Sequence, residues 1–211
     1  MPVEVELKYL ASGPAVLERL ATAPDLGPAE LGPPRTVAET DSYLDTPDRR
    51  LSTARWACRL RTREGTVRIS LKGPPEPGAG GALHRRPEVE GPAGNGRDPV
   101  AWPPSEARDL LDALRDGRPL IERLRLRQAR TERAVSIDGA RVGTLTLDVV
   151  DVAAGDREGG RLHVAELELD SQRTAGEARL HELRSALDAS DGLVADDATK
   201  LERALGMLGL A

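Results

Sequence analysis

The chain has 211 residues, a formal net charge of -5 and a sequence pI of ≈ 5.4, which does not favour binding to nucleic acid or anionic membranes. Aromatic residues make up 2% with no Phe, too few for stacking bases, and no segment approaches the ~20 apolar residues of a membrane-spanning helix. The single cysteine, Cys58, provides no disulfide framework, and the chain begins without a signal-peptide pattern. We therefore expect a single domain, residues 1–211, in a reducing cytoplasm.

Strand and helix patterns alternate along this domain. In chain order we expect a strand at 3–8, a helix at 14–21, a loop at 27–34, a strand at 36–44, a hairpin of 52–63 and 66–72, a loop at 73–81, a strand at 84–90, a helix at 106–115, strands at 121–137 (whole or broken), 143–152 and 161–169, and helices near 175–187 and 198–208. Ser12 and Ser105 are candidate caps. About eight strands with interspersed helices predict an α+β fold built on an antiparallel sheet.

Charged and apolar residues alternate within almost every predicted strand. In the first strand Glu4, Glu6 and Lys8 point to one side, and Val5 and Leu7 to the other. An open sheet with one face in water gives the same alternation. The signs of the charges favour a different interpretation, because Glu-x-Glu occurs three times and Arg-x-Arg recurs in two segments, 59–63 and 123–127, whereas solvated faces usually mix signs. If the sheet closes into a barrel, these side chains line a water-filled tunnel.

The charged residues of the strands fall into two chemical classes. Three carboxylate pairs, Glu4/Glu6, Glu88/Glu90 and Glu166/Glu168, together with Asp148, provide the all-oxygen environment that suits Mg²⁺ or Mn²⁺. A basic set offers donors for phosphate oxygens: Lys8, Arg59, Arg61, Lys72, Arg125 and Arg127. A polyphosphate is the natural common ligand, because divalent ions bridge it to the carboxylates while its remaining oxygens bind the basic groups.

An ordered set of motifs resembles the CYTH superfamily, the triphosphate tunnel metalloenzymes, over essentially the whole chain. The matching segments are Glu4-x-Glu6-x-Lys8, Tyr43-Leu44-Asp45-Thr46, Arg59-Leu60-Arg61, Leu71-Lys72, Arg86-x-Glu88-x-Glu90, Leu147-Asp148, Glu166-Leu167-Glu168-Leu169 and Lys200-Leu201-Glu202-Arg203-Ala204-Leu205. The resemblance implies an eight-stranded closed antiparallel β-barrel, the triphosphate tunnel, with helices packed on its outside.

The resemblance also implies roles for individual residues. Glu4, Glu6, Glu166 and Glu168, with Asp148, would hold the metal, while Glu88 and Glu90 would line the tunnel near a second metal or its water. The implied phosphate contacts are Lys8, Arg59, Arg61, Lys72, Arg86, Arg125, Arg127 and, near the tunnel mouth, Lys200.

Tyr43 is the candidate for a tyrosine that some family members pair with a lysine to handle protons. The partner position here carries Arg125, although Arg123, Arg127 and Arg130 could each occupy it. Arginine stays protonated, so it cannot act as a general base, and water activation would fall to the divalent ion.

These observations predict a Mg²⁺- or Mn²⁺-dependent triphosphatase acting on inorganic triphosphate or a small organic triphosphate. The alternatives are a module that binds polyphosphate or a nucleotide without turnover and, less favoured, an adenylate cyclase of the class IV type, which begins with a His-Phe segment absent here. The motif style is most similar to bacterial members fused to a helical CHAD domain, which makes such a domain a candidate partner. We expect Cys58, Trp56 and Trp102 to be packing residues, and the dispersed His84, His163 and His181 to bind no metal.

Overall fold

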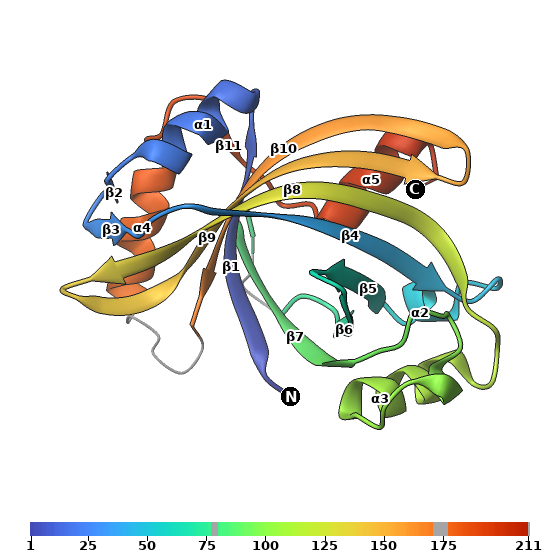
Figure 1. The fold of residues 1–211 in the computed structure, drawn as a ribbon. Helices are drawn as coiled ribbons and strands as arrows, with labels where there is room; N and C mark the ends of the chain where they lie inside the picture. The colour runs from blue at the N-terminus through green and yellow to red at the C-terminus, as the bar shows by residue number, and fades with distance from the viewer. Residues whose placement is uncertain (77–79, 171–176, 211) are drawn as a thin grey trace.

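Eight antiparallel strands close into a barrel in the computed structural model, which describes residues 1–76, 80–170 and 177–210. Around the barrel the strands follow the order β8, β4, β5, β6, β7, β1, β10, β9, and pairing between β9 and β8 closes the ring (Figure 1). Their bounds are β1 Val3–Ala11, β4 Arg35–Asp45, β5 Ala57–Arg63, β6 Thr66–Lys72, β7 Leu83–Pro92, β8 Ile121–Ile137, β9 Ala140–Ala154 and β10 Arg157–Leu169. The closed barrel and its α+β class confirm the sequence prediction.

Helices and three short strands surround this barrel. The helices are α1 Pro14–Thr22, α2 Arg50–Thr53, α3 Glu106–Arg115, α4 Glu177–Asp188 and α5 Lys200–Leu208, with a short 3₁₀ turn at Pro99–Ala101. The short strands are β2 Asp25–Leu26, β3 Ala29–Leu31 and β11 Leu193–Ala195, which extend the sheet at β8 and β1. Within the described residues no helix is long and apolar enough to cross a membrane.

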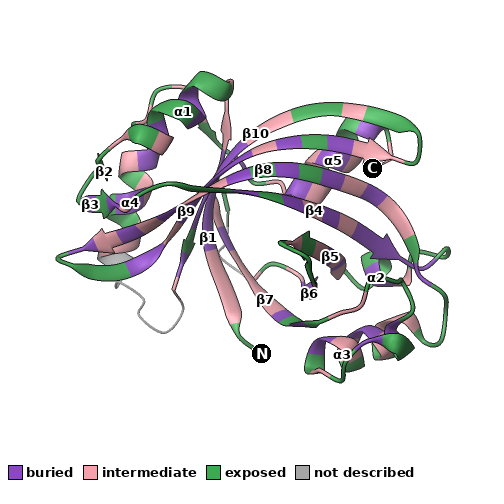
Figure 2. Cartoon of the chain, viewed as in Figure 1, coloured by how far each residue is buried: buried purple, intermediate pink, exposed green. Residues whose placement is uncertain are grey.

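The outward apolar faces of the strands are covered in two places. Alternate residues of β1, β9 and β10, such as Leu7, Leu145 and Leu167, pack under α1 and α4. At the other end of the barrel, a second cluster under α2 and α3 includes Cys58 and Trp102, which are 1% and 3% exposed (Figure 2). Their burial confirms that both are packing residues.

A third apolar cluster involves α5. Ala204 and Leu208 of this helix pack with Leu126 and Val152, which lie on the same strand faces as Arg130 and Asp148. The inward face of the barrel is therefore apolar where α5 covers it and charged beyond the N-terminus of that helix.

The elements depart from the sequence predictions mainly where the chain is irregular. The predicted loop at 27–34 contains β3, and the start of the predicted hairpin at 52–63 forms the end of α2, so that β5 begins only at Ala57. Gly13, not Ser12, precedes α1, whereas the Ser105 side chain accepts a hydrogen bond from Arg108 N as predicted. Strand β8 is unbroken. The predicted start of the helix near Ala175, and residues 77–79 of the predicted loop at 73–81, lie outside the described residues.

Candidate active site: a charged cavity inside the barrel

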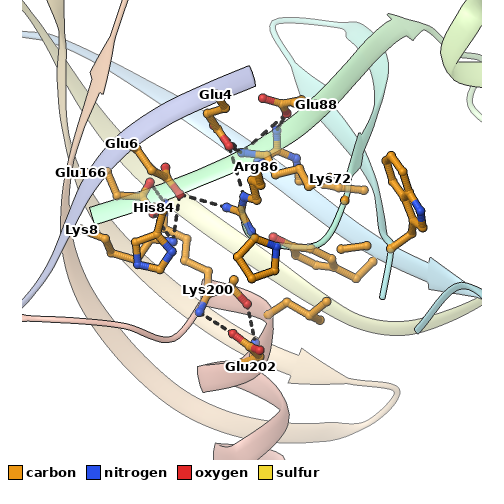
Figure 3. A pocket seen from close by; sticks show the side chains of 18 of the residues that line it. Glu4, Glu6, Lys8, Lys72, His84, Arg86, Glu88, Glu166, Lys200 and Glu202 are labelled. Atoms are coloured by element: carbon orange, nitrogen blue, oxygen red, sulfur yellow. Dashed lines mark hydrogen bonds and ion pairs between the residues drawn. The ribbon is translucent and has the colours of Figure 1, made fainter. Parts of the chain in front are cut away.

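The inward faces of the strands enclose a cavity of about 510 Å³, within the size range of small-molecule sites. Acidic and basic side chains line it together (Figure 3). The predicted site residues that line the cavity are Glu4, Glu6, Lys8, Tyr43, Arg59, Arg61, Lys72, Arg86, Glu88, Glu90, Glu166, Glu168 and Lys200. The structure therefore brings together most of the residues that the sequence singled out.

Strand alternation explains how these residues meet. On β1, Glu4, Glu6 and Lys8 face the cavity while Leu7 packs outside under α1. In the β1–β10 pairing Glu6 lies opposite Glu168 and Lys8 lies opposite Glu166. Directly opposed residues of antiparallel strands have neighbouring side chains, so two sequence-distant motifs form one site.

Ion pairs link the inward-facing side chains into a closed ring. Each acidic group lies within 4.0 Å of the next basic group, and the ring includes residues from all eight barrel strands and from α5. In order it runs Lys200, Glu166, Lys8, Glu6, Arg86, Glu4, Lys72, Glu88, Arg59, Asp41, Arg61, Glu39, Arg130, Asp148 and back to Lys200. Opposite charges are thus held together in an enclosed space, where their attraction is stronger than in water.

The carboxylates of the ring titrate differently. Burial raises the pKa of Glu4, and the neighbouring Glu6 adds to this effect. Burial would also raise the pKa of Glu6, but the ammonium of Lys8 leads the cations that lower it to about 2. Glu168, at the exposed edge of the site, has its pKa raised to about 7 by the surrounding protein and by the charge of Glu4. Burial and neighbouring carboxylates thus both disfavour the ionised forms of Glu4 and Glu168.

Arg59 differs from the other basic groups of the ring. Its guanidinium lies 3.7 Å from Asp41, 3.8 Å from Glu88 and 3.9 Å from Glu90, but it donates no hydrogen bond to a described side chain. Its Nε is buried without a hydrogen-bond partner among the described residues. A buried donor left unsatisfied costs free energy, so Arg59 is poised to bind an incoming anion.

The residues near Glu4 fit a hard divalent cation in their chemistry. Their donors are carboxylate oxygens, the ligands that Mg²⁺ and Mn²⁺ prefer, and a bound cation would offset the burial and the like charges that raise the pKa values of Glu4 and Glu168. Among the described residues, no group of three or more acidic, histidine or cysteine side chains is arranged to hold a metal ion. Glu4 instead accepts hydrogen bonds from Lys72, and Glu6 accepts one from Arg86.

Three predicted site residues lie elsewhere. Asp148 is fully buried behind the cavity, where it accepts two hydrogen bonds of 2.8 Å from Arg130 and one of 2.5 Å from Lys200. Arg125 and Arg127 do not line the cavity, because their side chains alternate with the inward-facing Leu126. Arg125 binds Glu122 instead, and Arg127 is exposed.

Of the four arginines considered as partners of Tyr43, Arg130 is the one that lines the cavity, but it lies opposite Val37 on β4, six residues along the strand from Tyr43. It lies on the inward face of β8 and pairs with Asp148, Glu39 and Glu166. Arg125 lies opposite Ser42, the residue beside Tyr43, and so on the other face of the sheet. Tyr43 itself lines the cavity and lies opposite Arg59 in the β4–β5 pairing.

Sequence reasoning missed further members of the ring. Asp41 is fully buried and accepts hydrogen bonds from Arg61 and Gln128. Glu39 lies two residues earlier on β4, so the Glu39-x-Asp41-x-Tyr43 alternation was the available signal. His84 also lines the cavity and forms a 2.8 Å hydrogen bond between its Nε2 and the carbonyl of Asp196.

A family model described as the CYTH domain matches residues 2–205. The chain belongs to the CYTH family. Among solved structures, HpAC1 from Hippeastrum, an adenylyl cyclase candidate whose structure is described as revealing a dominant triphosphatase activity, is similar at 19% identity with a TM-score of 0.66, covering 99% of this chain and 97% of that one. A candidate adenylate cyclase from Bacillus halodurans is 21% identical with a TM-score of 0.59, covering 96% and 98%.

PH1819 from Pyrococcus horikoshii is also similar, at 21% identity and a TM-score of 0.55, covering 96% of this chain and 98% of that one. No curated protein matches this CYTH chain. At these identities the structural likeness establishes the shared barrel, while the chemistry has to be argued from the cavity.

Proposed function

We propose that this CYTH domain is a Mg²⁺- or Mn²⁺-dependent triphosphatase that hydrolyses inorganic triphosphate or a small organic triphosphate inside the barrel. The observation that carries the proposal is the closed ring of alternating acidic and basic groups around the cavity. A ligand suited to this ring has dense negative charge and binds divalent cations, and a triphosphate has both properties.

Substrate binding in this proposal is an exchange of ion-pair partners. Phosphate oxygens take hydrogen bonds from Arg59, Lys72 and Arg86, whose present partners are carboxylates. The carboxylates released by this exchange, Glu4 and Glu6, would hold the divalent cation together with Glu168, which forms no ion pair within the described chain. Because each cation and carboxylate is already positioned by its strand, little reorganisation is needed.

Each group has a separate task in hydrolysis. The bound divalent cation would neutralise phosphate oxygens and lower the pKa of a bound water. Arg59 and Arg86 stabilise the charge that develops on the transferred phosphoryl group, and Lys8 and Lys200 keep the positive potential at the inner end of the cavity. Glu88, which accepts a 2.5 Å hydrogen bond from Ser70 and lies beside Lys72, would orient the attacking water.

One observation favours a second candidate, a module that holds a polyphosphate or nucleotide without turnover. The residue opposite Tyr43 on β5 is Arg59, an arginine that stays protonated and cannot accept a proton from it. Phosphate release from triphosphate with Mn²⁺ separates the two functions. A triphosphatase releases phosphate and loses this activity in the Glu4→Gln/Glu6→Gln double variant, whereas a binding module binds triphosphate tightly and releases none.

A further inference from the structure

Arg55 and Arg85 stand apart from the other basic residues that line the cavity, and Arg55 is the exposed one of the two. The Arg55 side chain is exposed at the cavity edge, and no described residue accepts a hydrogen bond from its guanidinium or forms an ion pair with it. Lys8, Lys72, Arg59, Arg86 and Lys200, by contrast, each lie within 4.0 Å of a carboxylate. Arg55 thus adds a positive charge that the ring does not neutralise.

The backbone places Arg55 beside one end of the ring. Trp56 follows it and lies next to Gly73, while Ala57 pairs with Lys72, the ring member in front of Gly73. A linear anion that binds Lys72 can therefore extend toward Arg55, because Arg55 lies only two residues before the strand partner of Lys72.

The turn that carries Arg55 is held firmly in place. Asp45 accepts hydrogen bonds from the backbone N–H groups of Thr46, Leu51 and Ser52, which fixes α2 against β4. Arg55 itself adopts a left-handed conformation, with φ of 62°, that is costly for a residue other than glycine. A charged residue with no partner is thus kept at a strained position on a rigid turn.

We propose that Arg55 forms a subsite for a fourth phosphate at the cavity edge, so that the barrel binds linear polyphosphates longer than triphosphate more tightly than triphosphate itself. This inference rests on the proposed function for the identity of the inner phosphates. It adds a residue that determines the preferred chain length.

Arg49 offers a matched control on the same turn. It is an exposed arginine with a left-handed φ of 58° at the other end of α2, but it does not line the cavity. Glycine adopts this conformation without strain, so Arg49→Gly and Arg55→Gly both remove a charge and a strained side chain. The two variants differ only in whether the lost charge adjoins the cavity.

Calorimetric titration in EDTA measures the dissociation constants of inorganic triphosphate and linear tetraphosphate without turnover. We expect the wild-type protein and Arg49→Gly to bind tetraphosphate about fivefold more tightly than triphosphate, the effect of one partly exposed charged hydrogen bond. In Arg55→Gly the two dissociation constants become nearly equal.

An unchanged ratio in Arg55→Gly, or equal affinities in the wild-type protein, overturns the subsite. If Arg49→Gly also loses the preference for tetraphosphate over triphosphate, the subsite is overturned as well, because the preference then arises from general surface charge. Failure of the proposed function gives a different result: the protein then releases no phosphate with Mn²⁺. The ratio of the two dissociation constants can still be measured in that case, so the subsite is tested separately.

Discussion

Lys200 joins the C-terminal helix to two barrel strands at once. Its Nζ lies 2.5 Å from Asp148 Oδ2 on β9 and 2.6 Å from Glu166 Oε2 on β10, and its side chain is only 9% exposed. The sequence indicated a lysine near the tunnel mouth. The structure instead makes this lysine the link that closes the ring of ion pairs.

Replacing Lys200 by Met should therefore destabilise the fold strongly. The change removes one of the two cations that Asp148 and Glu166 share and leaves Arg130 as the other, and the loss of two buried charged hydrogen bonds costs on the order of 3 kcal/mol of unfolding free energy. Urea denaturation measures this loss. Arg161→Met is the control, because it breaks an ion pair with Asp151 in which both side chains are more than half exposed, and it should change stability little. Equal effects of the two variants would show that the buried link at Lys200 is not important.

Strand alternation is a local property and predicted most of the inward-facing charges, whereas the closure of the barrel was implied by the resemblance to the CYTH superfamily. Glu4, Glu6 and Lys8 could be assigned to one face from their spacing alone. The arginines of β8 could not be assigned to the correct face in this way, because the polar residues of a strand were expected to face inward along its whole length. Leu124 and Leu126 face inward instead, since α5 packs on them, and this tertiary contact turns Arg125 and Arg127 outward.

Other members of the ring depend on partners that are distant in the sequence. Arg130 is recognisable only once β8 is paired with β9, where it lies opposite Asp148. Arg133, from the same arginine-rich run, donates hydrogen bonds to backbone carbonyls at Leu20, Leu31 and Gly32, far from the cavity. The sequence shows these arginines only as a cluster. The register of β8 against β4 and β9 determines which of them faces the cavity.

Asp41 should make the stability of the protein depend on pH in acid. Burial would raise its pKa, but Arg59 and the hydrogen-bonded Arg61 lower it below its ordinary value of 3.8. A carboxyl whose pKa is lower in the folded state stabilises the fold above its unfolded value and loses that contribution as the pH falls below about 4.

We therefore expect Asp41→Asn to be less stable than the wild-type protein by on the order of 3 kcal/mol at pH 7, with a difference that shrinks below pH 4. Urea unfolding of both proteins between pH 3 and pH 7 tests this. A difference that stays constant over that range would contradict the depressed pKa of Asp41.

Arg59→Ala should weaken triphosphate binding by about 1.5–3 kcal/mol, the contribution expected of hydrogen bonds to a charged ligand. Arg127→Ala is the matched control, because Arg127 lies on the outside of β8 and should leave the affinity unchanged. Calorimetric titration with triphosphate compares the two variants. If Arg127→Ala weakens binding as much as Arg59→Ala, the anion does not bind in the cavity.

Calcium should be a poor substitute for Mg²⁺ or Mn²⁺. Its coordination is larger and more flexible, so the attacked phosphorus would be held less accurately relative to Arg59 and Arg86. Phosphate release with Ca²⁺ should fall to roughly a tenth or less of the rate with Mn²⁺, a loss of the size expected when positioning is relaxed. Comparable rates with all three ions would mean that the cation does not position the substrate.

The triphosphatase activity is tested most directly by phosphate release from inorganic triphosphate with Mn²⁺, compared between the wild-type protein and the Glu4→Gln/Glu6→Gln double variant. We expect the wild-type protein to release phosphate in a metal-dependent reaction that EDTA abolishes and that the double variant lacks. Urea unfolding checks that the double variant is still folded. Tight binding of triphosphate by the wild-type protein with no metal-dependent release would contradict the enzymatic function.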